Sequence, residues 1–374
     1  MEHINETLEG LLLNESLVNN VTENFNDVAE SDYHLPQWIL NFYFGFICLG
    51  CAVDLIFVSA LIRSKRSGTL SLVLQISAVD AISPFIAAIE ILTLNNHTWI
   101  FSHNTCLIYN GLEILINSLT LWLIICLNFH VISLWNMHKS NTAKKNTNPL
   151  TSCGDESNEC LVTNREHSSN RILNIDYRKR KNDVAIVIPT ILIWFFCISL
   201  SIPNFTLSSI LKMKQQHTIC AIIDNFYGYI LQILLLVFKV LLPIPLILFS
   251  LIVSIIKLTK TSLKDIDTML TKDFVEIRDL LIFCIALTIL YLATSFQRNL
   301  FHFLHINSHS FSTNSSEIFK VPPLYNNQLS AWNNMSLTML HYSCNMLRAL
   351  LCLCMLPKFR GLIKNRIFFC STKD

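Results

Sequence analysis

The chain has 374 residues and a mean hydropathy of +0.45, and only 14% of its residues are charged. Soluble domains carry about 25% charged residues, so the composition excludes an ordinary soluble protein. The formal net charge is +2, and the basic residues form short clusters next to apolar segments, which gives no support for nucleic-acid binding.

Seven apolar segments are long enough to cross a bilayer, which takes about 20 residues in a helix. We expect helices because backbone groups in lipid must be hydrogen-bonded within the protein. The sequence therefore predicts an all-α membrane protein with a seven-transmembrane helix bundle. The predicted spans are 38–62, 69–94, 106–135, 183–203, 226–257, 276–304 and 331–356.

Two independent signals predict the orientation of the spans. Lys and Arg near spans favour the cytosol, whereas Asn-x-Ser/Thr sequons mark segments on the other side of the membrane. The two signals alternate along the chain, which predicts a plasma-membrane protein with its N-terminus outside the cell. No cleavable signal peptide is expected, since the start of the chain lacks a basic residue. The seven sequons are Asn5, Asn14, Asn20, Asn96, Asn204, Asn314 and Asn334.

The predicted organisation has three parts. An extracellular glycosylated tail covers 1–36, the membrane domain covers 37–357, and a short amphipathic eighth helix with the C-terminal tail covers 358–374. The longest cytosolic loop, 137–182, is rich in Asn, Ser and Thr, a composition that predicts disorder. Cys370 follows the eighth helix and is either an S-palmitoylation site or a free cysteine.

Motifs of common enzyme classes are missing from the sequence. There is no His-Glu-x-x-His, no Gly-x-Ser-x-Gly and no phosphate-binding glycine-rich loop, so we expect no enzyme, no metal and no cofactor. The architecture alone permits a receptor or a transporter. A transporter would have paired broken helices in two similar halves, and the prolines do not form such a pair.

Several elements of the chain match one family in order and spacing. Trp99-Ile100-Phe101 is followed by Cys106, and Cys220 precedes the fifth span. Further matches are Gly50-Cys51, Asp80, Trp194 with Pro203, Pro243 or Pro245, and Pro357-Lys358-Phe359-Arg360. Over roughly residues 35–370 the chain resembles the rhodopsin-like (class A) G-protein-coupled receptors. The resemblance implies a Cys106–Cys220 disulfide, an unknown extracellular ligand, and a heterotrimeric G protein or an arrestin as partner.

Three activation elements of that family are altered in this chain. The Asp-Arg-Tyr triplet is replaced by His130, Val131 and Ile132, and Arg348 opens the segment that stands in place of Asn-Pro-x-x-Tyr. Tyr291 stands where the family has the Trp of helix six. The family uses these elements to move helix six and admit a G protein. Because all three are altered here, the alternative is a protein with the receptor fold that does not signal or is constitutively biased.

Charged side chains within spans are candidates for function, because each costs roughly 2.5–3.5 kcal/mol on insertion scales. Glu113 lies seven residues after Cys106, where amine receptors of the family carry the acid that pairs with a ligand ammonium. Two acids and one Arg in a pocket suit a cationic or zwitterionic ligand. The alternative is internal pairing of Glu113 with Lys239 or a polar neighbour. The predicted pocket residues are Glu90, Glu113, Lys239, Tyr291 and Arg298.

A second candidate site joins Asp80 and Arg348. In the family, the helix-two acid and the helix-seven Asn lie close together around a sodium ion. An Arg cannot be deprotonated at this depth and must find an anion or carbonyl groups. We therefore predict an Asp80–Arg348 salt bridge whose guanidinium takes the place of sodium. Asp54, on the first span, is expected to be a hydrogen-bonded polar contact or a protonated acid.

Overall fold

The computed structural model describes residues 36–62, 67–96, 98–147, 186–212, 218–222, 226–260, 272–300, 328–357 and 360–361. The chain divides into the units Met1–Pro36 and Gln37–Asp374, and every element below belongs to the second unit. Within the described ranges, seven helices are long and apolar enough to cross a membrane. The chain thus has the architecture of a multi-pass membrane protein, as the apolar segments predict.

The first four crossing helices are continuous. They are α2 (Gln37–Ile62), α3 (Gly68–Asn96), α4 (His103–Thr147) and the helix Ile186–Leu207.

The fifth and sixth crossing helices each contain a π-helical turn, and the seventh is continuous. The fifth comprises α6 (Phe226–Leu236), η1 (Val237–Leu241) and α7 (Pro243–Thr259). The sixth comprises α9 (Lys272–Tyr291), η2 (Leu292–Phe296) and a last helical turn to Leu300. The seventh is α11 (Gln328–Met355).

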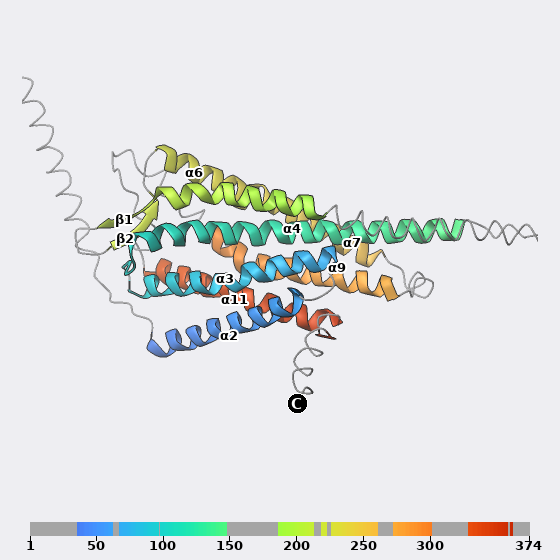
Figure 1. Cartoon of the computed structure of the whole chain (residues 1–374), viewed down its shortest axis with the longest axis horizontal. Helices are drawn as coiled ribbons and strands as arrows, with labels where there is room; N and C mark the ends of the chain where they lie inside the picture. The colour runs from blue at the N-terminus through green and yellow to red at the C-terminus, as the bar shows by residue number, and fades with distance from the viewer. Residues whose placement is uncertain are drawn as a thin grey trace, which may run out of the picture. The chain divides into compact units, whose positions relative to one another are not determined.

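A β-hairpin follows the fourth helix, a feature that the all-α prediction missed. Strands β1 (Ser208–Lys212) and β2 (Thr218–Ile222) are antiparallel, with Ile210 opposite Cys220. We call the end of the bundle that carries this hairpin the hairpin end, and the other end the far end (Figure 1).

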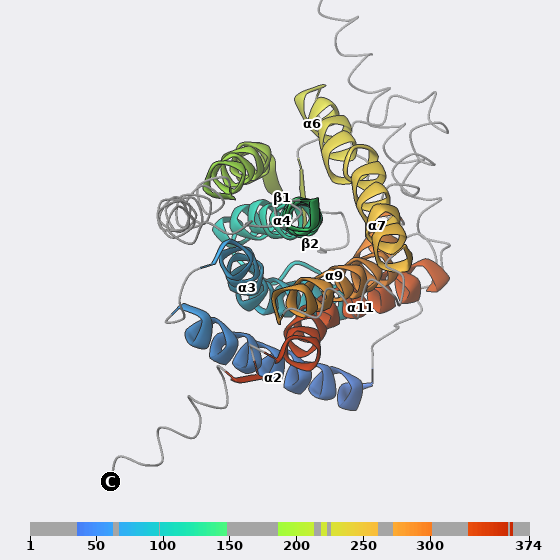
Figure 2. The same cartoon turned by 90° about the vertical axis from the view of Figure 1, so that its right-hand side faces the viewer.

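Helix α4 lies in the middle of the bundle when it is viewed end-on (Figure 2). It packs against α3, α7 and α9, while α2 packs against α3 and α11. Its apolar side chains form much of the core, where Leu123, Ile124 and Leu127 are fully buried. Any side chain that α4 presents to the core is therefore within reach of several helices.

Helix α4 extends further than the sequence predicts. The expected span ended at residue 135 and the loop was expected from 137, but the helix continues to Thr147. The intervening residues contain neither Gly nor Pro, so nothing in them breaks a helix. The helix ends two residues before Pro149, which disfavours helical geometry in the residue that precedes it.

The π-helical turn η1 has a clear cause in the sequence. Pro243 lacks a backbone N–H, and its ring clashes with the carbonyl group four residues earlier. Just before it, the Leu242 N–H donates to the Val237 carbonyl five residues back, at 2.9 Å, which is the π-helical pattern. The sixth helix widens in the same way at η2 without a proline, at the position where the family resemblance aligns Tyr291.

Candidate functional site

A disulfide fastens the hairpin to the start of α4. Cys106 and Cys220 are bonded with their Cα atoms 5.7 Å apart, within the usual range of roughly 4.4–6.8 Å. The Asn110 amide nitrogen lies 3.0 Å from the Ser208 hydroxyl. The Thr218 hydroxyl donates to the Trp99 carbonyl at 2.6 Å, so the segment between α3 and α4 is held to the hairpin as well.

Three of the predicted pocket residues form one ion-pair cluster, which we call the Arg298 cluster. The guanidinium of Arg298 lies 2.5 Å from Glu90 and 3.5 Å from Glu113, both measured from a nitrogen to a carboxylate oxygen. Arg298 and Glu90 are buried, whereas the Glu113 side chain is 20% exposed. The cluster therefore joins α3, α4 and the sixth helix with two acids against one base.

Glu90 is also hydrogen-bonded to the seventh crossing helix. It accepts hydrogen bonds from the Tyr342 hydroxyl at 2.6 Å and from the Thr338 hydroxyl at 3.3 Å, besides its ion pair. The Arg298 guanidinium also lies 5.4 Å from the centre of the Tyr342 ring, a cation–π distance. These contacts add α11 to the cluster, so four crossing helices meet at it.

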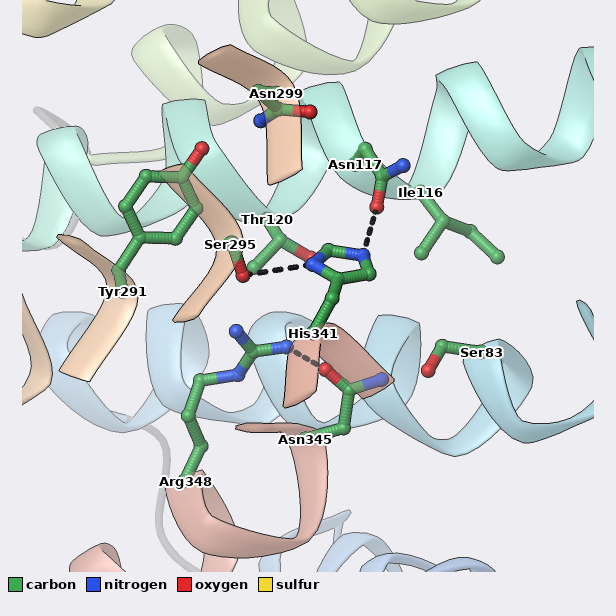
Figure 3. Close-up of a pocket in the computed structure, with 10 residues that line it drawn as sticks. All are labelled: Ser83, Ile116, Asn117, Thr120, Tyr291, Ser295, Asn299, His341, Asn345 and Arg348. Atoms are coloured by element: carbon green, nitrogen blue, oxygen red, sulfur yellow. Dashed lines mark hydrogen bonds between the residues drawn. The ribbon is translucent and has the colours of Figure 1, made fainter. Parts of the chain in front are cut away.

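A hydrogen-bonded relay continues from Glu113 towards the far end. The Asn117 amide donates to Glu113 at 2.7 Å, which leaves the Asn117 oxygen to face His341 Nε2 at 3.0 Å. His341 Nδ1 lies 2.9 Å from the Ser295 hydroxyl (Figure 3). Since an amide oxygen only accepts, Nε2 carries a proton, and in a neutral imidazole Nδ1 then accepts from Ser295. The relay thus fixes one tautomer of His341 and links α4, α11 and η2.

The sequence interpretation missed all three relay residues. Asn117, Ser295 and His341 are polar residues in largely apolar spans, and polar groups inside a membrane usually face the interior of the bundle. That signal was present, but pairing the three requires the rotation of each helix. The π-helical turn η2 alters that rotation for Ser295, and no sequence pattern announces this turn.

Asp80 and Arg348 form a second buried ion pair, which with Asn345 we call the Arg348 cluster. Nε and Nη2 of Arg348 donate to the two Asp80 oxygens at 2.9 and 2.6 Å. Nη2 also donates to the Asn345 side-chain oxygen. Two parallel bonds from one guanidinium to one carboxylate give strong geometric specificity. The structure thus brings together the two residues that the sequence pairs.

A small polar cavity adjoins both the relay and Arg348 (Figure 3). Its free volume is about 10 Å³, roughly the room for one water molecule. The hydroxyls of Ser83 and Thr120 border it and have no hydrogen-bond partner among the described residues. The lining residues are Ser83, Ile116, Asn117, Thr120, Tyr291, Ser295, Asn299, His341, Asn345 and Arg348.

The predicted pocket residues lie in different places. Tyr291 lines this cavity, whereas Glu90, Glu113 and Arg298 form the Arg298 cluster and are not among its lining residues. Lys239 lies half-buried in η1, and the described residues place no acid against it. Of the alternatives for Glu113, pairing with Lys239 is therefore not found among the described residues, whereas a polar neighbour, Asn117, donates to Glu113 at 2.7 Å.

The altered triplet lies in the far half of α4. Val131 is fully buried and Ile132 nearly so, and both belong to the apolar core. His130 is half-buried. Two of the three residues of this triplet are therefore apolar core contacts.

One predicted glycosylation site must be corrected. Asn204 is 0% exposed and lies in the helix Ile186–Leu207, which continues past the predicted end at 203. A side chain enclosed in this way has no room for a glycan.

The other sequons are exposed or lie outside what the structure describes. Asn96 is exposed at the end of α3. Asn334 lies in α11, but its side chain is not described. Four sequons lie outside the described residues: Asn5, Asn14, Asn20 and Asn314.

Two further predictions concern the eighth helix and Asp54. Of the eighth helix and tail, only Arg360 and Gly361 are described, and Cys370 lies outside. Asp54 is 1% exposed, and neither of its carboxylate oxygens has a hydrogen-bond partner in the described part of the chain. The hydrogen-bonded contact expected for Asp54 is therefore not found there.

No protein-family model and no curated protein matches the chain. The functional interpretation therefore rests on its own sequence and geometry.

Proposed function

We propose that the chain is a divergent receptor of the rhodopsin-like G-protein-coupled type. In this proposal it resides in the plasma membrane with its N-terminus and hairpin end outside the cell. The observation that carries the proposal is the disulfide between Cys106 at the start of the third crossing helix and Cys220 in the hairpin before the fifth. It joins the same two elements as the bridge of that family, in a chain with seven membrane-crossing helices.

The charge balance of the Arg298 cluster favours a cationic ligand. Arg298 sits 1.0 Å closer to Glu90 than to Glu113 (2.5 against 3.5 Å), and Glu90 has further donors. The cluster has two acids against one base, and Glu113 is the acid with the more exposed side chain, at 20% against 9% for Glu90. A ligand ammonium that reaches Glu113 would complete a cluster of two acids and two bases.

A second candidate function is a receptor-fold protein that does not activate G proteins. The observation that favours it is the bidentate Arg348–Asp80 pair, which fastens the seventh crossing helix to the second at 2.6 and 2.9 Å. Breaking the pair would leave two charges in a desolvated core, which costs several kcal/mol. Such a bridge opposes the movement of the seventh helix on which activation depends in the family.

The test is expression of the full chain in cells with a panel of G-protein and arrestin recruitment sensors, first without ligand and then with a library of amines. Signal above untransfected cells, lost on Glu113→Gln for any active amine, supports the receptor. Thr93→Ala, on the outer part of α3, is a control that leaves the acids intact. Sensors that stay silent at full surface expression would favour the second candidate.

The orientation is tested separately with epitope tags. An N-terminal tag should be stained on intact cells, and a C-terminal tag only after permeabilisation. The reverse pattern would overturn the proposed topology and with it the assignment of the hairpin end to the outside.

A further inference from the structure

Glu113 fixes the orientation of the Asn117 side-chain amide. Asn117 lies four residues after Glu113 on α4, and its amide nitrogen donates to Glu113 Oε1 at 2.7 Å. The same carboxylate oxygen accepts from Arg298 Nη1 at 3.5 Å. Because an ionised carboxylate only accepts hydrogen bonds, the amide must turn its nitrogen towards Glu113. The Asn117 oxygen is therefore the atom that faces the other way.

The Asn117 oxygen in turn determines which ring nitrogen of His341 carries a proton. It lies 3.0 Å from Nε2, while Nδ1 lies 2.9 Å from the Ser295 hydroxyl (Figure 3). His341 and Ser295 are both buried, so their polar atoms depend on partners within the protein. Nε2 must donate, and in a neutral ring Nδ1 is left to accept from Ser295. A carboxylate on α4 thus places a proton on α11 through one amide.

The opposite arrangement fits the same residues. An asparagine amide that turns over exchanges its oxygen and nitrogen at nearly the same positions. The Asn117 nitrogen would then donate to Nε2 of His341, and Nδ1–H would donate to the Ser295 oxygen. The Ser295 hydroxyl would need a new acceptor, and the carbonyl group four residues before it is a common one for serine. In the same turn, Thr294 already donates to the Leu290 carbonyl in this way, at 2.7 Å.

The change between the two arrangements moves one proton within a neutral ring. The Nε2–H bond breaks and an Nδ1–H bond forms, while the lone pair of the ring passes from Nδ1 to Nε2. Water carries the proton, because it can accept from one nitrogen and donate to the other. The cavity that Asn117, Ser295 and His341 all line has a free volume of about 10 Å³, roughly the room for one water molecule.

We propose that the relay is a two-state element that records whether Glu113 engages Asn117. While Glu113 holds the amide, His341 keeps its proton on Nε2. When a cation draws the carboxylate away, the amide turns over and the proton moves to Nδ1. Ser295, in η2 of the sixth crossing helix, then changes from donor to acceptor towards His341. The proposal rests on the proposed function in one respect, which is that a cationic ligand is what takes Glu113.

The experiment observes the two ring nitrogens of His341 by solid-state NMR. The full chain, with its histidines labelled with ¹³C and ¹⁵N, is placed in lipid vesicles at neutral pH without any ligand. The His341 signals are those missing from His341→Gln. Protonated and bare ring nitrogens resonate far apart, and their correlations with the ring carbons distinguish Nε2 from Nδ1. The parent chain should show a proton on Nε2 and a bare Nδ1.

Glu113→Leu removes the acceptor that orients the amide. It should produce a population with the proton on Nδ1 that is at least severalfold larger than in the parent chain. The variant keeps the ion pair of Arg298 with Glu90 at 2.5 Å, so the cluster then has one acid for one base. Asn117→Leu interrupts the relay one step later and should produce the same population. It serves if Glu113→Leu does not fold.

The matched control is Ser295→Ala, which removes the partner of Nδ1 but leaves Glu113 and Asn117 in place. It should keep the proton of His341 on Nε2. A parent chain with the proton on Nδ1 or on both nitrogens overturns the proposal. So does a parent-like spectrum in folded Glu113→Leu, or in Asn117→Leu if only that variant folds. A move of the proton to Nδ1 in Ser295→Ala would also overturn it, because Ser295 would then control the ring.

This outcome is independent of the sensor assays, because the spectra are recorded on the isolated protein without a ligand. Sensors that stay silent beside the expected spectra would reject the receptor function and leave the relay intact. Active sensors beside a proton that does not respond to Glu113→Leu would reject the relay alone.

Discussion

Arg348 places two guanidinium nitrogens on the Asp80 carboxylate, and both side chains are buried. Asp80→Asn or Arg348→Leu should each lower the free energy of unfolding by about 3–5 kcal/mol, because the remaining charge is stranded. The double variant Asp80→Leu/Arg348→Leu should recover most of this loss. Thermal unfolding in detergent provides the measurement. A double variant no more stable than the weaker single one would show that the two residues do not act as a pair.

The same pair predicts how the protein responds to sodium. Because the guanidinium occupies the space beside Asp80, exchanging sodium for choline should leave the melting temperature of the natural chain unchanged. Arg348→Asn frees the carboxylate and should introduce a sodium-dependent rise in melting temperature. A sodium effect in the natural chain would mean that a cation still reaches Asp80.

Asp54 presents the opposite situation, a buried carboxylate without a hydrogen-bond partner in the described part of the chain. Asp54→Asn keeps the shape and removes the charge, so it should raise the free energy of unfolding by about 1–3 kcal/mol. Asp279→Asn, on a partly exposed acid of α9, is the control and should have little effect. An unchanged melting temperature for Asp54→Asn would show that the native core contains no uncompensated charge at this position.

At the scale of elements, the disulfide links the start of α4 to the hairpin. Cys106→Ala should destabilise the protein by about 2–5 kcal/mol, as is usual when a native bridge is lost, and should reduce surface expression measured by flow cytometry. Cys48→Ala, which removes an exposed free cysteine of α2, should have no such effect. Equal expression of the two variants would contradict a structural role for the bridge.

The elements also show which parts of the fold can be predicted from sequence. The crossing helices were predictable because lipid demands long apolar segments, and this constraint needs no knowledge of tertiary contacts. The π-helical turn η1 can be explained by Pro243 only in hindsight, and η2 has no comparable marker. The hairpin was missed because two five-residue strands are too short to show a clear pattern.

Some residues of the candidate site could likewise be predicted from the sequence, and others could not. The Asp80–Arg348 pair was predictable because the resemblance places these two positions close together and an Arg at that depth needs an anion. The ion pairs of Arg298 with Glu90 and Glu113 were not predicted, since the three residues were expected only to line one pocket. Neutral polar residues are more common in spans, so Asn117, Ser295 and His341 offered too many combinations. Asn204 was wrongly interpreted because a sequon records local sequence alone, whereas accessibility depends on where the helix ends and what packs against it.

At the scale of the whole molecule, the exposure of the sequon side chains indicates which surfaces at the hairpin end are accessible. Asn96 is exposed there and Asn204 is enclosed. Asn96→Gln should therefore remove one glycan from the protein expressed in mammalian cells, and Asn204→Gln should remove none. Gel mobility before and after glycosidase treatment distinguishes the two. Loss of a glycan in Asn204→Gln would mean that the fourth crossing helix ends earlier than Leu207.

The length of α4 sets a distance outside the membrane. Its 45 residues span about 68 Å at roughly 1.5 Å per residue, more than twice the bilayer's hydrocarbon thickness of about 30 Å. A continuous helix of this length is too long to lie wholly within the bilayer, so part of it extends into the water. The third crossing helix therefore forms the centre of the bundle and also reaches beyond the membrane.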